Sequence, residues 1–397
     1  MISISTDSLI FAAVLVLSPL LLRRSGKYRR YMFLILNLLI FFLSMEEVSQ
    51  AVVGILWILI PYLLAGRVSK FRPLLIGVMV AVFAYLMHYD AVFVTLHIPY
   101  AFPWRILGLS YFLFRQIDYI MQYEYLKSEE VPLGFVDYLN YILSFYTLLA
   151  GPILRYADFR EDFYRVVSPP EKEEIFSCLN RALNGYLKVY VLSALAGHFA
   201  GQFFEDLGSH SSVITTAGAF FVFAYLNCWY IYFNFSGYCD IVISFAALSG
   251  LTVKENFNRP YMSRSVAEFW NRHHISLSEW IRDYLYSPVF KALLSGPFEK
   301  NVQAGQYLAL FLTFTIAGIW HGTDMNYLVY GLFQGLGIVI ATAFKSWRKK
   351  HLGKERNKAW EKSPVAATAG RVITWVYISL TFSFVGYDVV GWIRGAV

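Results

Sequence analysis

Long apolar stretches recur along the chain and are separated by short polar connections. The first four run over residues 9–22, 31–44, 51–65 and 74–87. A helix needs about 20 residues to cross the hydrocarbon layer of a bilayer, so these stretches must draw on flanking residues or lie where the bilayer is thin. The pattern predicts an all-α polytopic membrane protein.

The later part of the chain continues this pattern. Further apolar stretches run over residues 135–149, 180–200, 214–235, 306–320, 327–344 and 372–385. We therefore expect one transmembrane domain over residues 1–397. Within it we expect N-terminal spans at 1–105, a core at 106–345, a basic cytoplasmic loop at 346–365 and a C-terminal span at 366–397.

Composition supports a membrane protein. Hydrophobic residues make up 57% of the chain and charged residues 15%, whereas soluble domains average about 45–50% and about 25%. The basic residues form three clusters beside apolar stretches, at 23–30, 67–72 and 345–358. Such clusters are typical of cytoplasmic loops, so we expect a multi-pass protein of the cell (plasma or inner) membrane with its N-terminus outside. The net charge of +7 is then no sign of nucleic-acid binding, and contact with membrane lipids is a secondary role for these clusters.

The three cysteines do not indicate a metal or disulfide site. Cys178, Cys228 and Cys239 form no CxxC pair, so the sequence predicts neither a zinc site nor a disulfide framework. Cys239 could in principle carry a thioester, but a lone cysteine in an apolar stretch is usually a small packing residue. The stretch at 9–22 follows Asp7 and precedes basic residues, which is the reverse of a cleavable signal peptide.

Polar residues inside apolar stretches mark further points of interest. Arg115 and Asp118 are three residues apart, and we expect a structural ion pair between them. Gly151-Pro152 predicts a break in a helix. The polar residues at 236–240 predict a discontinuous helix, in which Asp240 either faces a buried cation or lies at an interface.

The segment after residue 264 reads as an amphipathic helix. Ser265 and Glu268 have the spacing of a capping box, and Glu268 and Arg272 can pair one turn apart. We expect one helix with two stripes: an aromatic stripe of Trp270, His273, Leu277, Trp280 and Tyr284, and a polar stripe of Asn271, His274, Ser278 and Arg282. His274 is therefore the better candidate for chemistry, and His273 the better candidate for packing.

His321 ends the apolar stretch at 306–320 and precedes Gly322, a natural helix C-cap. Two interpretations are equally compatible with the residues. In one, His321 lies in an interfacial loop between two spans. In the other, it ends a broken helix and faces a tunnel, where an ionisable residue at membrane depth is a functional candidate.

At these residues the chain resembles the membrane-bound O-acyltransferase (MBOAT) family, and specifically its bacterial branch. That branch includes alginate and peptidoglycan O-acetylation proteins and the D-alanine transfer protein of teichoic-acid modification. The likeness covers roughly residues 108–344. Its motifs include Ala150-Gly151-Pro152-Ile153-Leu154-Arg155, Phe233-Asn234-Phe235-Ser236-Gly237-Tyr238, the segment 269–286 and Ile319-Trp320-His321-Gly322.

The resemblance implies roles for both histidines. His321 matches the family's catalytic histidine, and His274 matches the histidine of its Arg-Trp-His-x-Ser-Leu-Ser motif. The implied fold is a ring of tilted helices around a central tunnel, with re-entrant and interfacial helices. Two departures from the family pattern do not touch the matched catalytic positions: His273 stands for the usual Trp and Asn234 for the usual Asp. A third, Ser287-Pro288-Val289-Phe290 for the usual Pro-Leu-Gly-Gly, leaves the sub-branch open.

These observations predict a membrane O-acyltransferase with His321 as general base and His274 as its helper. Other candidates for binding substrate or lining the tunnel are Asn271, Arg272, Ser278, Trp320 and Asp240. No bound cofactor is expected, because the acyl donor would be a thioester substrate, acetyl-CoA or an acyl carrier protein, on the cytoplasmic side. The acceptor would be a cell-surface polysaccharide, reached with an extracytoplasmic acyltransferase partner protein.

Two alternatives stay open. The acyl group is expected to be acetyl, but transfer of D-alanine to teichoic acid is a close alternative. A transporter or channel without bond chemistry is an alternative of another class, because discontinuous helices and intramembrane histidines suit it too.

Overall fold

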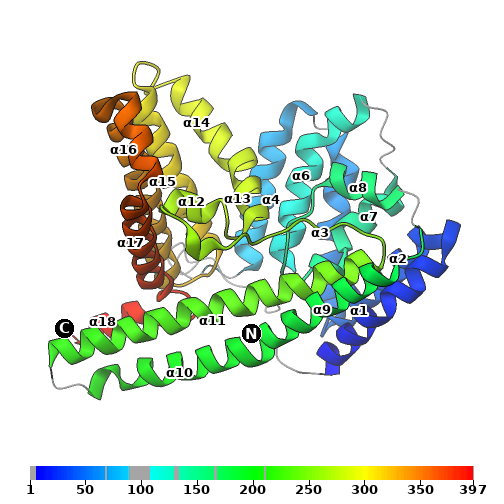
Figure 1. Ribbon diagram of the computed structural model, residues 1–397. Coiled ribbons are helices and arrows are strands. Elements are labelled where there is room, and N and C mark those ends of the chain that lie inside the picture. Colours follow the sequence, from blue (N-terminus) through cyan, green and yellow to red (C-terminus); the bar gives the residue numbers. More distant parts are fainter. Residues whose placement is uncertain are drawn as a thin grey trace. The chain divides into compact units, whose positions relative to one another are not determined.

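The computed structural model describes residues 6–67, 69–87, 89, 108–128, 134–164, 168–209 and 212–396 (Figure 1). These residues form helices, and the only β-structure among them is one isolated bridge between Phe257 and His273. Five of the described helices are long and apolar enough to cross a membrane: Val48–Ala65, Val213–Leu248, Val302–Trp320, Met325–Lys362 and Pro364–Phe382. The prediction of an all-α polytopic membrane protein is confirmed.

The chain forms two compact units. The first contains Met1–Leu187 and Gly237–Glu255, and the second contains Lys188–Ser236 and Asn256–Val397. The long helix α11, Val213–Leu248, contributes to both. The units differ from the predicted segments because the chain leaves the first unit after Leu187 and returns to it at Gly237.

The first unit is built from helices that follow the predicted apolar stretches. They are α1 (Thr6–Arg24), α2 (Arg29–Leu43), α3 (Val48–Ala65), α4 (Arg72–Leu86), α6 (Leu109–Ser128), α7 (Phe135–Leu143), α8 (Tyr156–Tyr164) and α9 (Lys172–Leu187). The predicted break at Gly151-Pro152 is confirmed: residues 148–155 are not helical, and Gly151 has φ +106°. This conformation suits glycine because it has no Cβ.

The predicted pair between Arg115 and Asp118 does not form; each side chain has other partners. Arg115 donates to the carbonyl oxygens of Tyr141 (3.1 Å) and Thr147 (2.7 Å), where α7 ends and leaves carbonyls without helical partners. Asp118 forms an ion pair with Arg155, with its Oδ1 atom 3.0 Å from Nη1 of the arginine. The bend after α7 therefore supplies better partners than the neighbouring helical position.

The predicted discontinuity at residues 236–240 is wrong, because α11 is helical throughout. Gly237 instead permits close packing within the first unit: a Cβ on Gly185 of α9 would lie 2.7 Å from the Gly237 carbonyl oxygen. Asp240 on α11 pairs with Arg181 at 2.9 Å, and Arg181 also pairs with Glu255 at 2.6 Å. Asp240 thus faces a cation, the first of its two predicted roles.

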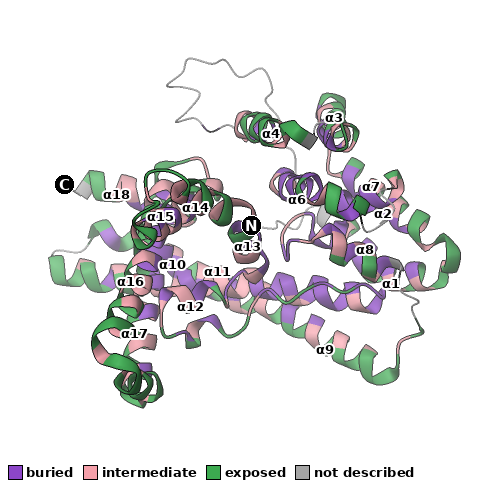
Figure 2. Cartoon of the chain, turned by 90° about the horizontal axis from the view of Figure 1, so that it is seen from above, coloured by how far each residue is buried: buried purple, intermediate pink, exposed green. Residues whose placement is uncertain are grey.

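The second unit contains the C-terminal spans. After α10 (Ser193–Glu205) and the first part of α11 come α12 (Val266–Trp270), α13 (Ile275–Ile281), α14 (Ser287–Leu294), α15 (Val302–Trp320), α16 (Met325–Lys362), α17 (Pro364–Phe382) and α18 (Val389–Ala396). Figure 1 shows α15, α16 and α17 side by side. Much of α17 is exposed, as expected of a helix that faces lipid (Figure 2).

Glycine brings α15 and α16 into close contact. A Cβ on Gly318 would lie 2.2 Å from Cα of Gly331, and a Cβ on Gly335 would lie 2.8 Å from the Phe311 carbonyl oxygen. Small residues at such crossings let helix backbones approach within membranes, where dispersion contacts replace the hydrophobic effect as the driving force. This crossing places the end of α15 against the start of α16.

The basic segment 346–365, predicted as a loop, is helical up to Lys362. The helix is interrupted at Gly353, whose φ of +68° and ψ of +172° are not helical. The second arm folds back on the first, because Arg348 pairs with Glu361 (2.9 Å) and donates to Asn357 (2.7 Å). Residues 345–362 thus form a helical hairpin, which we call the basic hairpin.

Candidate functional site

The predicted amphipathic helix begins as expected but does not continue. Ser265 caps α12 by accepting from the backbone N–H of Glu268, and Glu268 pairs with Arg272 at 2.7 Å. However, α12 ends at Trp270, and α13 begins only at Ile275. The prediction of one helix carrying two stripes is therefore wrong.

Backbone pairing with residues 256–258 explains the break. The Asn258 N–H donates to the Arg272 carbonyl oxygen (2.9 Å), and the Ile275 N–H donates to that of Asn256 (3.0 Å). His274 has φ +50°, in the left-handed region that is uncommon for residues other than glycine. The chain turns at His273 and His274, so the two histidines are directed by this turn and not by a helical stripe.

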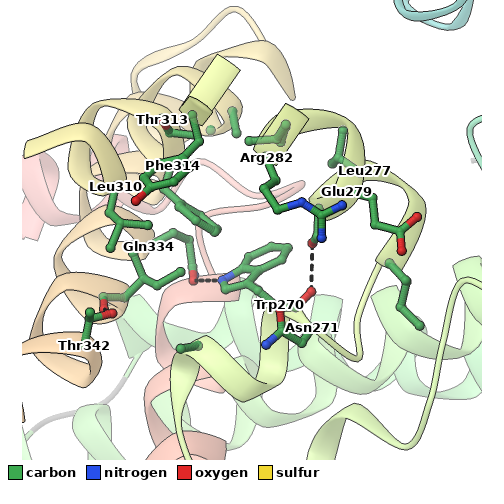
Figure 3. Close-up of a pocket in the computed structure, with 18 of the residues that line it drawn as sticks. Trp270, Asn271, Leu277, Glu279, Arg282, Leu310, Thr313, Phe314, Gln334 and Thr342 are labelled. Carbon is green, nitrogen blue, oxygen red and sulfur yellow. Dashed lines mark hydrogen bonds between the residues drawn. The ribbon is translucent and has the colours of Figure 1, made fainter. Parts of the chain in front are cut away.

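A pocket of about 360 Å³ lies within the second unit, between the segment of α12–α14 and the pair α15 and α16 (Figure 3). Three of the predicted site residues line it, namely Asn271, Ser278 and His321. The structure brings these three together although the predicted helix is broken.

The pocket is elongated along α15 and α16. Its lining positions on α15 follow one face of the helix from Gln306 to His321, a rise of about 22 Å. The lining positions on α16 are Tyr330, Gln334, Ile338 and Thr342. Because Gly318 packs against Gly331, Tyr330 lies at the His321 end. The pocket is therefore a groove that ends at an imidazole.

His321 is the C-cap residue of α15, one position beyond the span. Its ring centroid lies 4.5 Å from that of Trp320 and 5.9 Å from that of Tyr330. The side chain is open to the pocket, but the surrounding protein displaces bulk water and lowers the pKa of His321 below its ordinary value. The lowered pKa favours the neutral form of the ring, which can accept a proton.

Gly322 makes the turn after His321 possible. A Cβ at this position would lie 2.0 Å from the ring of Tyr327. The backbone N–H of His321 donates to the Gly318 carbonyl oxygen at 3.0 Å, which ends the helix in a tight turn. The prediction of Gly322 as the C-cap is wrong, because His321 is the C-cap residue and Gly322 instead permits the close approach of Tyr327.

One wall of the pocket is fixed by hydrogen bonds across three helices. The indole Nε1 of Trp270 donates to Oε1 of Gln334 (3.2 Å), and Nε2 of Gln334 donates to Oγ1 of Thr381 (2.7 Å). Ser278 Oγ donates to the Trp270 carbonyl oxygen at 2.7 Å. Sequence reasoning missed Gln334, although a glutamine within an apolar span was a usable signal.

His274 lies behind the wall and is not a lining residue of the pocket. It is buried, its Nδ1 is 3.3 Å from Oδ1 of Asn256, and its ring meets that of Phe235 edge-on with centroids 4.7 Å apart. Burial and the nearby His273 and His321 lower the pKa of His274 well below its ordinary value. This environment suits a positioning role better than contact with a reacting group.

His273 occupies an aromatic box. Its ring stacks on Phe269 (4.8 Å) and meets Phe257, Trp270 and Phe382 edge-on. Neither ring nitrogen has a hydrogen-bond partner among the described residues. Burial, followed by the charge of His321, lowers the pKa of His273 to about 3. Its surroundings fit the predicted packing role.

The other predicted lining residues lie elsewhere. Asp240 is part of the first unit, Arg272 is held by Glu268, and Trp320 faces the ring of His321 without lining the pocket. These three residues do not line this pocket, and their contact with substrate or with a tunnel stays a prediction. The pocket is instead completed by residues of α13–α16, including Leu277, Glu279, Arg282, Tyr286, Thr313 and Phe314.

Comparison with known proteins identifies the family of this chain. The family model for the membrane-bound O-acyltransferase family matches residues 32–385, which is most of the chain. The chain belongs to the MBOAT family. His321, Asn271 and Ser278 all lie within the matched region.

Two groups of bacterial MBOAT relatives are similar to this chain. The teichoic acid D-alanyltransferase of Streptococcus thermophilus is 31% identical over 262 residues, covering 64% of this chain and 60% of the relative. The probable alginate O-acetylase AlgI of Pseudomonas aeruginosa is 32% identical over 240 residues, covering 60% and 42%. The chain thus spans between two fifths and three fifths of the length of these relatives.

Proposed function

We propose that this MBOAT chain is a membrane O-acyltransferase in which His321 acts as the general base. The observation that carries the proposal is that the imidazole of His321 ends an elongated groove and is open to it. Histidine is a common general base, and proton transfer to such a base contributes about 10²–10⁴-fold to a rate. Family membership and the relatives' names support the same class of reaction.

The proposed step transfers an acyl group from sulfur to oxygen. His321 accepts the proton of the acceptor hydroxyl while the oxygen of that hydroxyl attacks the thioester carbonyl carbon. The C–S bond breaks, the ester C–O bond forms, and the leaving thiolate takes up a proton. Asn271 lines the pocket and carries an amide N–H₂ that could donate to the oxyanion during attack.

The shape of the groove supports a thioester donor on a long, flexible arm. A pantetheine arm, carried by coenzyme A or by an acyl carrier protein, is linear and could lie along α15 with its sulfur near His321. The tunnel predicted from the sequence would be this groove extended through the membrane. Donor entry from the cytoplasm and an acceptor polysaccharide outside, reached with a partner acyltransferase, complete the proposal.

The acyl group is proposed to be acetyl. The side chains on the pocket face near His321 are neutral or apolar, including Ala317, Gly318 and Tyr330. An acetyl group is neutral and small, and it needs no charged partner in such surroundings. Acetyl transfer corresponds to the named activity of the alginate O-acetylase relatives.

Glu279 supports D-alanyl transfer as a second candidate. It is the one acidic residue among those that line the described pocket. A D-alanyl group carries an ammonium, which a carboxylate would stabilise as an ion pair. The Glu279→Gln variant separates the candidates, because it should lose transfer of D-alanine and keep transfer of acetate.

The experiment that tests the proposal uses the purified full chain in nanodiscs with radiolabelled acetyl and D-alanyl thioesters. Wild type should consume the acetyl donor, and His321→Gln should lose at least ~100-fold in rate at equal protein level. Full activity of His321→Gln would remove the base assignment. Consumption of neither donor by wild type would remove the proposed function and favour a transporter without bond chemistry.

A further inference from the structure

The basic hairpin concentrates the positive charge of the protein. Residues 345–362 contain eight basic and two acidic side chains, a net charge of +6 in a chain whose net charge is +7. Arg348 is held by Glu361 and Asn357. The other basic side chains are exposed and have no ion pair with a described residue: Lys345, Lys349, Lys350, Lys354, Arg356, Lys358 and Lys362.

Aromatic rings form a cluster at the base of the same hairpin. Phe344 lies against Trp347 with ring centroids 6.1 Å apart, and against Trp360 at 6.3 Å. The Arg348 guanidinium sits over the rings of Phe344 (5.9 Å) and Trp360 (6.0 Å). Despite these contacts the rings stay 47%, 53% and 43% exposed, for Phe344, Trp347 and Trp360 respectively.

The position of this cluster relative to the spans indicates its surroundings. The apolar part of α16, residues 325–344, is about 30 Å long, which equals the hydrocarbon thickness of a bilayer. Phe344 and Trp347 therefore fall at the end of the span, and α17 begins at Pro364 directly after the hairpin. Tryptophan is enriched at membrane–water interfaces, where its apolar ring and polar N–H are both accommodated.

We propose that the basic hairpin binds anionic lipid headgroups, with Phe344, Trp347 and Trp360 in the interface and the free lysines on the lipid phosphates. Clusters of four to eight basic residues next to a span attract anionic lipids. The hairpin would fix the depth of α16 and α17, and hence of the groove that α16 lines. This proposal does not depend on the proposed acyl-transfer activity.

An acidic carrier protein is the competing partner for a basic surface. The exposed rings favour lipid, because they lie at the end of two spans and beside the charges, as an interfacial anchor requires. The ion pair between Arg348 and Glu361 holds both arms of the basic hairpin close to the end of the spans. A carrier would need the charges but not the rings at membrane level.

The test compares two triple variants of the full chain by native mass spectrometry in detergent, titrated with phosphatidylglycerol or phosphatidylcholine. Lys349→Gln/Lys350→Gln/Lys354→Gln alters the hairpin, and Arg24→Gln/Lys27→Gln/Arg30→Gln removes the same charge from another exposed cluster. The apparent Kd for phosphatidylglycerol should rise at least ~tenfold in the hairpin variant and change less than ~threefold in the control. Phosphatidylcholine binding should not change in either variant.

A second measurement tests the aromatic part. In nanodiscs, brominated phosphatidylglycerol should quench part of the tryptophan emission of wild type, and Trp347→Phe/Trp360→Phe should lose that part. Equal weakening in both triple variants, or no weakening, would overturn the proposal. Displacement of the bound lipid by equimolar inorganic phosphate would also overturn it. The same holds if the hairpin triple variant lost binding to an acidic acyl carrier protein while its lipid binding stayed unchanged.

Discussion

Nδ1 of His274 lies 3.3 Å from Oδ1 of Asn256, and this pair supports the pocket from behind instead of facing it. The same Asn256 oxygen accepts from the backbone N–H (3.1 Å) and the hydroxyl (2.9 Å) of Ser276 at the start of α13. His274 and Asn256 thus fix the turn that directs Asn271 and Ser278 into the pocket. A positioning role and a chemical role for His274 make different predictions.

We expect His274→Asn to keep at least about one tenth of the wild-type kcat, whereas His321→Asn should lose ~100-fold or more. Asparagine tolerates the left-handed conformation at position 274 and can still bond to Asn256. Initial rates with saturating thioester would measure both variants. Equal losses would show that His274 takes part in the chemistry directly.

In its effect on stability, the Asn256→Ala variant should resemble His274→Ala more than His321→Ala. It leaves the buried Ser276 groups without their acceptor, which costs roughly 1–3 kcal/mol for each unsatisfied group. The thermal midpoint in detergent should fall for both variants and stay near wild type for His321→Ala. A normal midpoint for Asn256→Ala would contradict the structural role of this pair.

The rate should be constant through neutral pH and fall on the acid side. The base must be neutral to accept a proton, and the pKa of His321 is lowered below its ordinary value of about 6.5. The acid limb of kcat/KM should therefore lie below pH ~6.5, at a lower pH than a solvent-exposed histidine would give. If kcat/KM began to fall above pH 7 on the acid side of its profile, the titration of another group would limit the rate.

His273→Phe should stabilise the protein, because it removes two buried nitrogens without partners and keeps an aromatic ring in the box. It should also change the pH dependence of stability. The folded pKa of His273 is about 3 and the unfolded value about 6.5, so the unfolded chain binds one more proton between these values. Stability rises with pH in that window, and the variant should lose up to ~1.4 kcal/mol per pH unit of that slope.

Urea or thermal unfolding in detergent at pH 4.5 and 7.5 would measure this change. His198→Phe is the control for the substitution of a histidine by phenylalanine, since His198 lies on α10 and is not part of the aromatic box. A destabilised His273→Phe with unaltered slope would indicate that a water or ligand occupies the box and bonds to the ring.

Gly318→Ala should destabilise the second unit by roughly 1–3 kcal/mol and lower activity, because the added Cβ would meet the backbone of Gly331. The control is Gly218→Ala on α11, where nothing lies within 4 Å of an added Cβ. That substitution should be neutral or stabilising, by up to about 1 kcal/mol. Equal effects at both positions would show that the crossing of α15 and α16 is looser than described.

The sequence by itself determined the apolar helices and the cap at Ser265, and it made His321 a candidate for the chemistry. Each depends on residues close in the chain: periodic apolar positions need lipid or protein around them, and Ser265 needs only the N–H three residues later. Family resemblance added the prediction that His321 is catalytic, which no local pattern could supply. The aromatic surroundings of His273 fit the packing role predicted for it, although that prediction rested on a helical stripe that does not exist.

Tertiary structure alone decided which of the neighbouring polar residues meet at one pocket. Pairing with residues 256–258 breaks the helix at His274, so positions that share a stripe in the sequence point to different places. Gln334 and Tyr330 enter the site because Gly318 and Gly331 let two helices touch, a contact set by packing between segments. Helical spacing orders side chains only while the helix continues, and its end at Trp270 was set by distant backbone partners.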